Sequence, residues 1–187
     1  MGFKAIDALA SDTDIDVSKA KFHALIGKGK IAGEKVILCK PQTYMNQSGI
    51  AARECAMYFD VPRENVIVIY DDIDLPIASL RIRKAGGAGT HNGMKSVVQQ
   101  LGITDFPRIR IGVGAAEGDE DLIDRVIGKV PKSEKALLDE AASKAAEAVF
   151  CQQYPCIFHR RDERQRHCHR TWFRDGWWRS LHTRLCP

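Results

Sequence analysis

The chain has 187 residues, 44% of them hydrophobic, which is enough for the core of one α/β domain. It has no run of about 18 apolar residues that would span a membrane. Its first residues also lack the apolar stretch of a secretory signal. We therefore expect a cytoplasmic protein without membrane association.

The formal net charge of +4 averages two parts of the chain that differ sharply. Residues 1–150 sum to −1, whereas residues 151–187 sum to +5 and hold all three Trp, four of six Cys and four of six His. Such a break in composition predicts a domain over residues 1–150, followed by an atypical, disordered Arg/Cys/His/Trp-rich tail over residues 151–187.

Hydrophobic periodicity predicts helices and strands in alternation. In chain order we expect a helix over residues 1–10, strands over 22–28 and 35–39, a helix over 48–58, strands over 66–70 and 80–83, a helix over 93–101, a strand over 108–114 and a helix over 131–150. Phe3, Ile6 and Leu9 should share the buried face of the first helix, which a polar break over residues 11–14 should end. This alternation is typical of a single α/β domain with helices on both faces of its sheet.

Local signals refine several of these elements. Ala32-Gly33 should form a hairpin turn, and the β-branched run over residues 66–70 should be a strand buried on both faces. Asn92 is a candidate N-cap for the helix that follows it, and the polar residues 46–48 are candidate caps for the helix over 48–58.

Three polar clusters fall at strand ends or helix starts, which is where sites form in open α/β sheets. In the first, Asn46 could donate its amide N–H to a developing oxyanion, although its position alone favours an N-cap and turn. In the second, Asp71, Asp72 and Asp74 could orient a histidine, bind Mg²⁺ or cap a loop. The third is a glycine loop ending in His91, which could be structural or part of a site.

Basic residues flank the glycine loop. Arg81, Arg83 and Lys84 precede it, while Arg108 and Arg110 lie on the next expected strand. Arg83 and Arg110 alternate with apolar residues and should share a face, and paired arginines suit phosphate contacts. Ordinary surface charge is the alternative explanation.

Together and in this order, the clusters resemble the successive signatures of bacterial-type peptidyl-tRNA hydrolase. The segments are YMNQSG at residues 44–49, DDIDLP at 71–76, GGAGTHNGMK at 86–95 and FPRIRIGVG at 106–114. The resemblance covers roughly residues 1–150. It implies a single domain around a twisted, mixed central sheet, and an enzyme that hydrolyses the ester between a peptide and the 3′ ribose of tRNA, which frees tRNA for translation. It also implies no metal or other cofactor, and a monomer whose partner is peptidyl-tRNA.

The resemblance also assigns roles to individual residues, all as expectations. Asp71 would hold a general-base histidine in the right tautomer, and Asn46 would stabilise the tetrahedral oxyanion. Asn92, with His91 beside it, would fix the peptide main chain and the attacking water. The expected lining of the cleft is Tyr44 and Met45, and the expected contacts to the tRNA 5′ phosphate are Arg83 and Arg110.

The sequence departs from the family at both ends. Met1-Gly2-Phe3 matches the start of the family's first helix, which places the catalytic histidine about two residues before Met1 and leaves out the family's first, central strand. None of the six histidines replaces it, and a positioned acid–base group is worth roughly 10²–10⁴ in rate. We therefore expect the chain as given to be impaired or inactive, with Met1 an internal methionine and the tail a frameshift product.

Three other hypotheses remain open at this point. One is a non-catalytic RNA-binding relative of the hydrolase. Another is a metal-dependent phosphoesterase that uses Asp71, Asp72, Asp74 and His91. The third is a zinc site in the tail, whose candidate ligands are Cys156, His159, His167, Cys168, His169 and His182, although their spacing matches no zinc-finger pattern.

Overall fold

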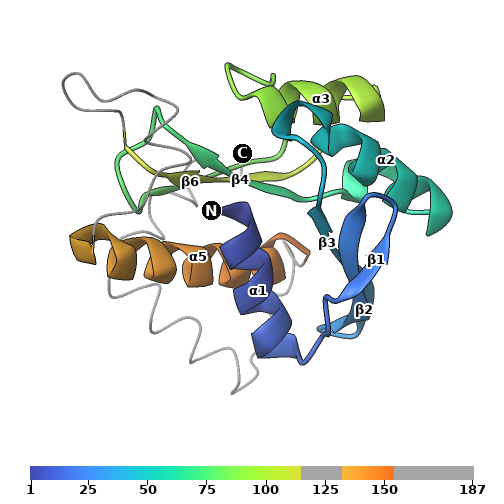
Figure 1. Cartoon of the computed structure of the whole chain (residues 1–187), viewed down its shortest axis with the longest axis horizontal. Coiled ribbons are helices and arrows are strands. Elements are labelled where there is room, and N and C mark those ends of the chain that lie inside the picture. Colours follow the sequence, from blue (N-terminus) through green and yellow to red (C-terminus); the bar gives the residue numbers. More distant parts are fainter. Residues whose placement is uncertain (115–131, 154–187) are drawn as a thin grey trace, which may run out of the picture. The chain divides into compact units, whose positions relative to one another are not determined.

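The computed structural model of the chain describes residues 1–114 and 132–153 (Figure 1). Its helices are α1 (Gly2–Thr13), α2 (Ser48–Tyr58), α3 (Asn92–Leu101) and α5 (Lys132–Gln153), with short 3-10 helices η1 (Met45–Gln47) and η2 (Arg63–Asn65). Its strands are β1 (Lys19–Lys21), β2 (Ala24–Ile31), β3 (Glu34–Pro41), β4 (Val68–Asp72), β5 (Leu80–Arg83) and β6 (Arg108–Gly112). The α/β class predicted from the sequence is confirmed, and residues 1–153 form one unit.

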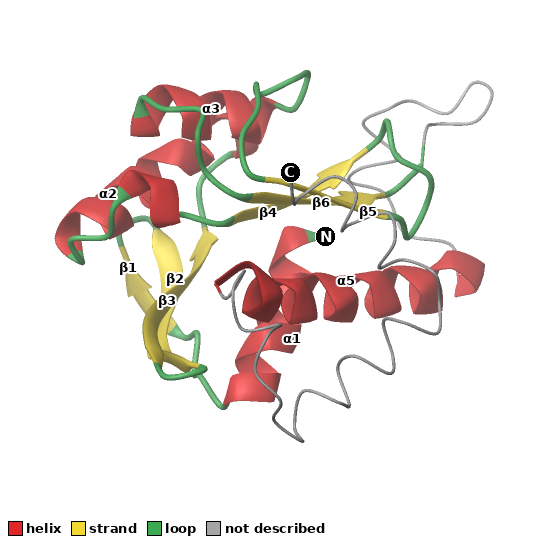
Figure 2. Ribbon diagram, turned by 180° about the vertical axis from the view of Figure 1, so that it is seen from behind, coloured by secondary structure: helices red, strands yellow, loops and turns green. Residues whose placement is uncertain are grey.

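The described strands form two sheets. One is mixed, with the order β4-β6-β5, in which β6 pairs parallel with β4 and antiparallel with β5. Helix α3 lies on one side of this sheet, while α1 and α5 lie on the other (Figure 2). The expected arrangement of helices on both faces is therefore confirmed for this sheet.

The second sheet is antiparallel, with the order β1-β2-β3. A two-residue turn joins β2 to β3, because Ile31 pairs with Glu34 across Ala32 and Gly33. Both turn residues have positive φ, at 50° and 93°, as the tightest hairpin turns require. The hairpin predicted at Ala32-Gly33 is confirmed, with strands longer than expected.

The main core lies between the mixed sheet and the two helices α1 and α5. Ala5 and Leu9 of α1 meet Ile109 and Ile111 of β6 there. From α5 the core receives mostly small side chains, namely Leu138, Ala141, Ala142, Ala145, Ala146, Ala148 and Val149. Small residues on α5 let its backbone come close to α1, which explains why an alanine-rich helix carries so much of the core.

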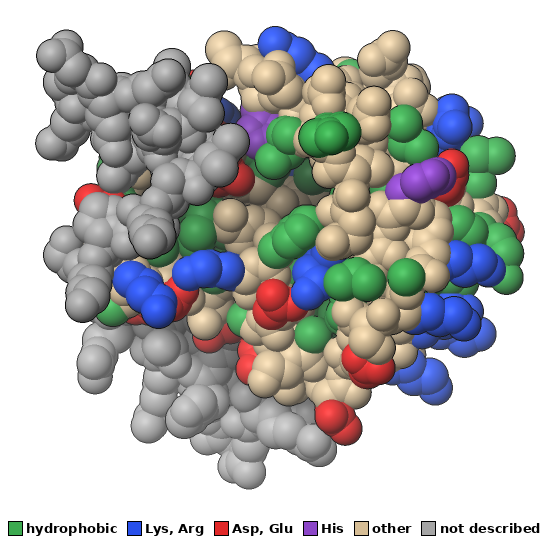
Figure 3. Space-filling view, in the orientation of Figure 1, with side chains coloured by type: hydrophobic (Ala, Val, Ile, Leu, Met, Phe, Trp, Pro, Cys, Tyr) green, Lys and Arg blue, Asp and Glu red, His purple; other side chains and the backbone are tan. Residues whose placement is uncertain are grey.

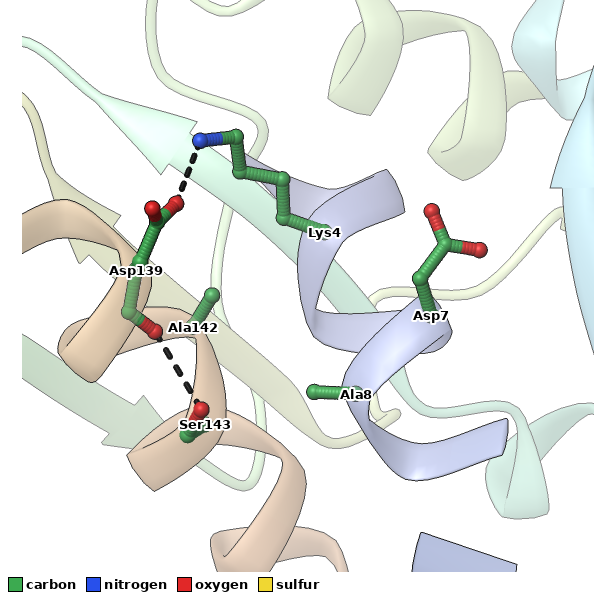
Figure 4. A pocket seen from close by; sticks show the side chains of 6 residues that line it. All are labelled: Lys4, Asp7, Ala8, Asp139, Ala142 and Ser143. Carbon is green, nitrogen blue, oxygen red and sulfur yellow. Dashed lines mark hydrogen bonds and ion pairs between the residues drawn. The ribbon is translucent and has the colours of Figure 1, made fainter. Parts of the chain in front are cut away.

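Ion pairs join α1 to its neighbours on two sides. Lys4 Nζ contacts Asp139 Oδ1 of α5 at 2.5 Å, across a shallow hollow of about 250 Å³ between the two helices (Figure 4). The ammonium of Lys4 lowers the pKa of Asp139. Asp7 also lines this hollow, and its Oδ1 lies 2.5 Å from Lys40 Nζ of β3. The hollow is therefore a seam between packed helices, crossed by an ion pair.

Several expected boundaries and contacts were wrong. Helix α1 continues through the expected polar break to Thr13, whose hydroxyl donates to the Leu9 carbonyl, and it ends at Asp14 in a left-handed conformation. Phe3 is 47% exposed, although the pattern placed it on the buried face. Strand β1 was not expected, because Lys19-Ala20-Lys21 is short and polar and becomes a strand only by pairing with β2.

The strand expected over residues 66–70 is shifted and less buried than predicted. It runs from Val68 to Asp72, and only Tyr70 and Asp72 of its residues are fully buried. Among the described residues β4 pairs only with β6, so one of its edges has no strand beside it there. Helix caps also differ, since α2 has no side-chain cap and α3 is capped by His91, whereas Asn92 is its first residue.

Helix α5 runs three residues past Phe150, where the sequence placed the domain boundary. The expectations for the tail beyond Gln153, including its disorder and its zinc ligands, lie outside the described residues. No helix within the described ranges is long and apolar enough to cross a membrane.

Candidate functional site

The carboxyl ends of the parallel strands β4 and β6 bring the first candidate residues to one edge of the mixed sheet. Asp71 and Asp72 pair with Ile111 and Gly112 at the last positions of the two strands. The Asp71 side chain is 15% exposed, and its Oδ1 lies 3.7 Å from the backbone nitrogen of Met1. The polypeptide at the start of α1 therefore lies against this carboxylate.

Two close approaches hold the beginnings of α2 and α3 together. A Cβ on Gly49 would lie 2.2 Å from the Ser96 carbonyl oxygen, so only glycine allows this crossing. The Gly49 N–H also donates to Ser96 Oγ at 3.0 Å. At the other contact, a Cβ on Gly93 would lie 2.7 Å from Met45 Sδ, which shows that η1 packs on the first turn of α3. The segment around Asn46 is thereby fixed beside the segment around Asn92.

Both candidate asparagines are exposed at this junction. Asn46 lies in η1 and Asn92 opens α3, so neither amide is used in the core. Tyr44 is 82% exposed and Met45 51% exposed beside them. Exposed apolar side chains next to free amides suit a cleft that takes a ligand with both apolar and hydrogen-bonding groups.

A hollow of about 490 Å³ opens next to this junction. It is lined by His23, Gln42, Thr43, Tyr44 and Gln47. His23 stands at its rim as an exposed side chain, and its Nδ1 lies 3.1 Å from Glu54 Oε2. The first sequence cluster thus supplies four of the five residues that line this hollow. Of the two residues expected to line the cleft, Tyr44 is among them and Met45 is not.

His91, one of the candidate site residues, is the N-cap of α3. Its Nδ1 accepts the Met94 N–H at 3.1 Å, which requires the neutral ring to carry its proton on Nε2. Its ring contacts Tyr70 of β4 at a centroid distance of 4.9 Å. Burial lowers the pKa of His91, while Asp71 and Asp72 act to raise it. These carboxylates therefore lie close enough to the ring to affect its charge.

Arg83 and Arg110, the expected phosphate contacts, have different neighbours in the structure. Arg83 faces Arg108 across the β5–β6 ladder, and Arg108 and Arg110 alternate on β6, so all three side chains lie on one face. The prediction that Arg83 and Arg110 share a face is confirmed. Arg110, however, donates from Nε to Oδ2 of the buried Asp72, so part of its guanidinium is engaged within the site.

The buried contacts of Arg108 were not predicted from the sequence. It is 2% exposed, and it donates to the carbonyls of Gly87 at 2.8 Å and Thr104 at 2.9 Å. Its guanidinium lies 4.4 Å from the centre of the Phe106 ring. Arg108 therefore fastens the glycine loop that leads into His91 and Asn92. The sequence shows only an arginine alternating with Arg110, which gives no sign of this burial.

The candidate metal ligands do not form a cluster in the described part of the chain. No group of three or more His, Cys, Asp or Glu side chains is placed there to hold an ion. Asp72 instead accepts the Asp74 N–H at 2.9 Å in addition to its pair with Arg110. Asp74 itself is exposed.

Comparison with known proteins gives one consistent answer. Residues 1–164 match the family described as Peptidyl-tRNA hydrolase. Peptidyl-tRNA hydrolases from a Thermoanaerobacter species and from Caldanaerobacter subterraneus are each 50% identical over 150 residues, which cover 80% of this chain and 80% of theirs. A crystal structure of peptidyl-tRNA hydrolase from Acinetobacter baumannii is 32% identical with a TM-score of 0.75, over 82% of this chain and 80% of that one. On sequence and structure together, this chain belongs to the peptidyl-tRNA hydrolase family of esterases.

Proposed function

We propose that this site hydrolyses the ester bond that joins a peptide to the 3′ ribose of tRNA. The observation that carries the proposal is the junction of α2 and α3, where Met45 packs on Gly93 and the amides of Asn46 and Asn92 are exposed. Burial lowers the pKa of His91, the residue before Asn92, and Asp71 lies close enough to act to raise it. Family membership supports the same reaction, because the relatives carry the name of that activity.

The reaction needs a water molecule to lose a proton and attack the ester carbonyl. The carbonyl oxygen then becomes negatively charged, and the exposed amide of Asn46 can donate to it without moving out of a packed core. Collapse of this intermediate breaks the bond to the ribose oxygen, which leaves with a proton. The products are the free peptide acid and tRNA with a free 3′ hydroxyl.

Asn92 and His91 would hold the peptide main chain and the water. With Nδ1 of His91 accepting the Met94 N–H, Nε2 remains as a hydrogen-bond donor. Burial lowers the pKa of His91 below its ordinary value and so favours the neutral ring. Tyr44 and Met45 would line the peptide side of the cleft.

Asp71 would orient the general base. The family resemblance puts that histidine about two residues before Met1, and the nitrogen of Met1 lies 3.7 Å from Asp71 Oδ1. The backbone of a residue about two positions before Met1 would therefore lie near the Asp71 carboxylate. The tRNA 5′ phosphate would be held by Arg83 and Arg110, with Arg110 fixed in direction by Asp72.

The test compares two chains. One is the chain as given; the other, here called the extended chain, carries the family's N-terminal segment through Thr-Arg-His-Asn ahead of Met1 and ends near Phe150. Hydrolysis of a peptidyl-tRNA is measured for both in the presence of EDTA. Cleavage by the extended chain supports the proposal. Binding of RNA without cleavage by either chain would contradict it and favour a non-catalytic RNA-binding relative.

A further inference from the structure

Five lysines share one face of the β1-β2-β3 sheet. Residues directly opposite in an antiparallel pair lie on the same face, and so do alternate residues of one strand. Lys19 pairs with Ile26, Lys21 with Ala24 and Lys30 with Lys35. Ala24, Ile26, Lys28 and Lys30 alternate along β2. The face that we call the lysine face therefore holds Lys19, Lys21, Lys28, Lys30 and Lys35.

Four lysines of the lysine face are exposed and Lys21 is half-buried, while Ala24 and Ile26 on the same face are buried against α2. The exposed part of the face carries uncompensated charge. Residues 19–41 hold six lysines and a single acidic residue, Glu34, which pairs with Ile31 on the opposite face. Lys40 is the one lysine of this segment that is paired with a carboxylate, Asp7. Within residues 1–114 and 132–153, none of the five lysines of the lysine face forms an ion pair with an acidic side chain. Basic side chains gather visibly on the side of the molecule that carries β1 and β2 (Figure 3).

Aromatic rings hold two of these ammonium groups in place. Phe22, Tyr58 and Phe59 contact one another with centroid distances of 4.7 to 5.9 Å. Lys21 Nζ lies 3.7 Å from the Tyr58 centroid, and Lys28 Nζ lies 4.4 Å from that of Phe59. Contact with a ring face orients an ammonium without neutralising it, so the positive charge stays available to an incoming anion. Lys21 also lowers the pKa of Tyr58.

The aromatic cluster lies at the far end of α2 from the candidate active site. Asn46 lies just before α2, whereas Tyr58 ends it and Phe59 follows. Eleven helical residues span about 16 Å at 1.5 Å per residue. A nucleic acid with its 3′ end at Asn46 would therefore have to extend along the length of α2 to reach the lysine face.

We propose that the lysine face binds the phosphate backbone of the tRNA whose 3′ end enters the site. This inference rests on the proposed function for the identity of the partner. Its basis is charge complementarity, because a group of lysines without acidic partners, two of them held by aromatic rings, fits a row of phosphates and needs no base-specific contact. The face is separate from Arg83 and Arg110, which belong to the other sheet.

The test uses the whole chain and deacylated tRNA, so that it needs no turnover. The variant Lys19→Gln/Lys28→Gln/Lys30→Gln removes three exposed charges from the lysine face. The control Lys4→Gln/Lys135→Gln/Lys144→Gln removes three charges from α1 and α5. Binding is measured over a range of salt concentrations, and thermal melting shows whether each variant is folded.

We expect the lysine-face variant to bind tRNA at least tenfold more weakly. The slope of log K against log[salt] should become shallower by about 0.9 for each duplex phosphate that the variant no longer neutralises, or roughly 2 to 3 in all. The control should keep the slope of the parent chain. Equal slopes for parent and lysine-face variant, both folded, would overturn the proposal.

Two further outcomes separate this inference from its alternatives. If the extended chain fails to cleave peptidyl-tRNA but tRNA binding still depends on the lysine face, the proposed function fails and the lysine face stands as an RNA-binding surface. If the variant loses binding to polyglutamate as strongly as binding to tRNA, the assignment to RNA phosphates is overturned in favour of acidic protein partners.

Discussion

The two sheets differ in how far helices cover them and in how their charged side chains are paired. The β4-β6-β5 sheet lies between α3 on one side and α1 and α5 on the other, and its polar residues are held by fixed contacts such as those of Asp72 with Arg110. The β1-β2-β3 sheet instead exposes most of the lysine face, where Lys21 and Lys28 contact aromatic rings. Among the described residues no acidic side chain forms an ion pair with a lysine of this face. Catalysis requires functional groups that are held in one geometry. Binding of a nucleic-acid phosphate backbone requires only positive charge at roughly the right positions. The difference suggests catalysis at the first sheet and attachment at the second.

The largest expected effect is on the chemical step at the edge of the mixed sheet. In the extended chain, Asp71→Asn should lower kcat by about 10²–10⁴, because the amide cannot hold the base in its working tautomer. KM for peptidyl-tRNA should change little. The matched control is Asp74→Asn, since Asp74 is exposed three positions away. An equal fall in kcat for both variants would show that Asp71 has no special role.

The next effect concerns the crossing of α2 and α3. Gly49→Ala places a methyl group where the Ser96 carbonyl oxygen lies 2.2 Å away, so the helices must separate. Such overpacking should lower the free energy of unfolding by about 3 kcal/mol and reduce hydrolysis as well. Gly87→Ala is the control, because nothing lies within 4 Å of the added carbon. Urea unfolding of the two variants checks the prediction, which is wrong if both match the parent.

Loss of Arg108 should have a smaller effect on stability. Arg108→Leu leaves the carbonyls of Gly87 and Thr104 without their donor, at a cost of about 2 kcal/mol in the free energy of unfolding. The glycine loop should also become more accessible to hydrogen exchange. Arg81→Leu changes an exposed arginine on β5 and should stay within about 0.5 kcal/mol of the parent. A parent-like stability for Arg108→Leu would show that the loop is held by other contacts.

The smallest effect is a dependence of stability on pH that comes from His91. The pKa of His91 is lowered from 6.5 in the folded chain, so below pH 6.5 the unfolded chain takes up the proton first and stability falls. Above pH 6.5 this contribution is fully present. Protonation also removes the Nδ1 acceptor that caps α3, which is worth about 1 kcal/mol.

His91→Asn supplies a cap that does not titrate. The free energy of unfolding of each protein is measured with urea at pH 7.5 and at pH 5. Between these pH values it should fall by about 1 kcal/mol more in the parent than in the variant. Equal losses in the two proteins would mean that carboxylates alone set the pH dependence.

The candidate site residues could be named from the sequence because they occur in short, ordered segments that resemble one family. Asn46, Asp71 and Asn92 lie in strings whose order is specific to one family, and the structure places them at helix starts and at a strand end. Contacts made across the fold could not be predicted in this way. Arg108 and Arg110 differ by two positions in one strand, yet one is buried against Gly87 and the other pairs with Asp72.

The same limit applies to the fold. The helix over residues 48–58 was predicted with its correct ends, since a continuous local pattern defines it. Strand β1 and the division into two sheets depend on pairing between distant segments, which periodicity does not encode. The lysine face was missed for this reason, because its five members fall on three strands and share a face only through the register.

The most direct test of the central claim is single-turnover hydrolysis of peptidyl-tRNA by the extended chain and its Asn46→Ala variant, both at saturating enzyme. Removing one oxyanion donor should slow cleavage by about 10²–10³ while tRNA binding stays unchanged. Gln99→Ala, which removes an exposed amide further along α3, should cleave at the parent rate. Equal rates for the parent and Asn46→Ala would contradict the proposal that the junction of α2 and α3 is where the ester is hydrolysed.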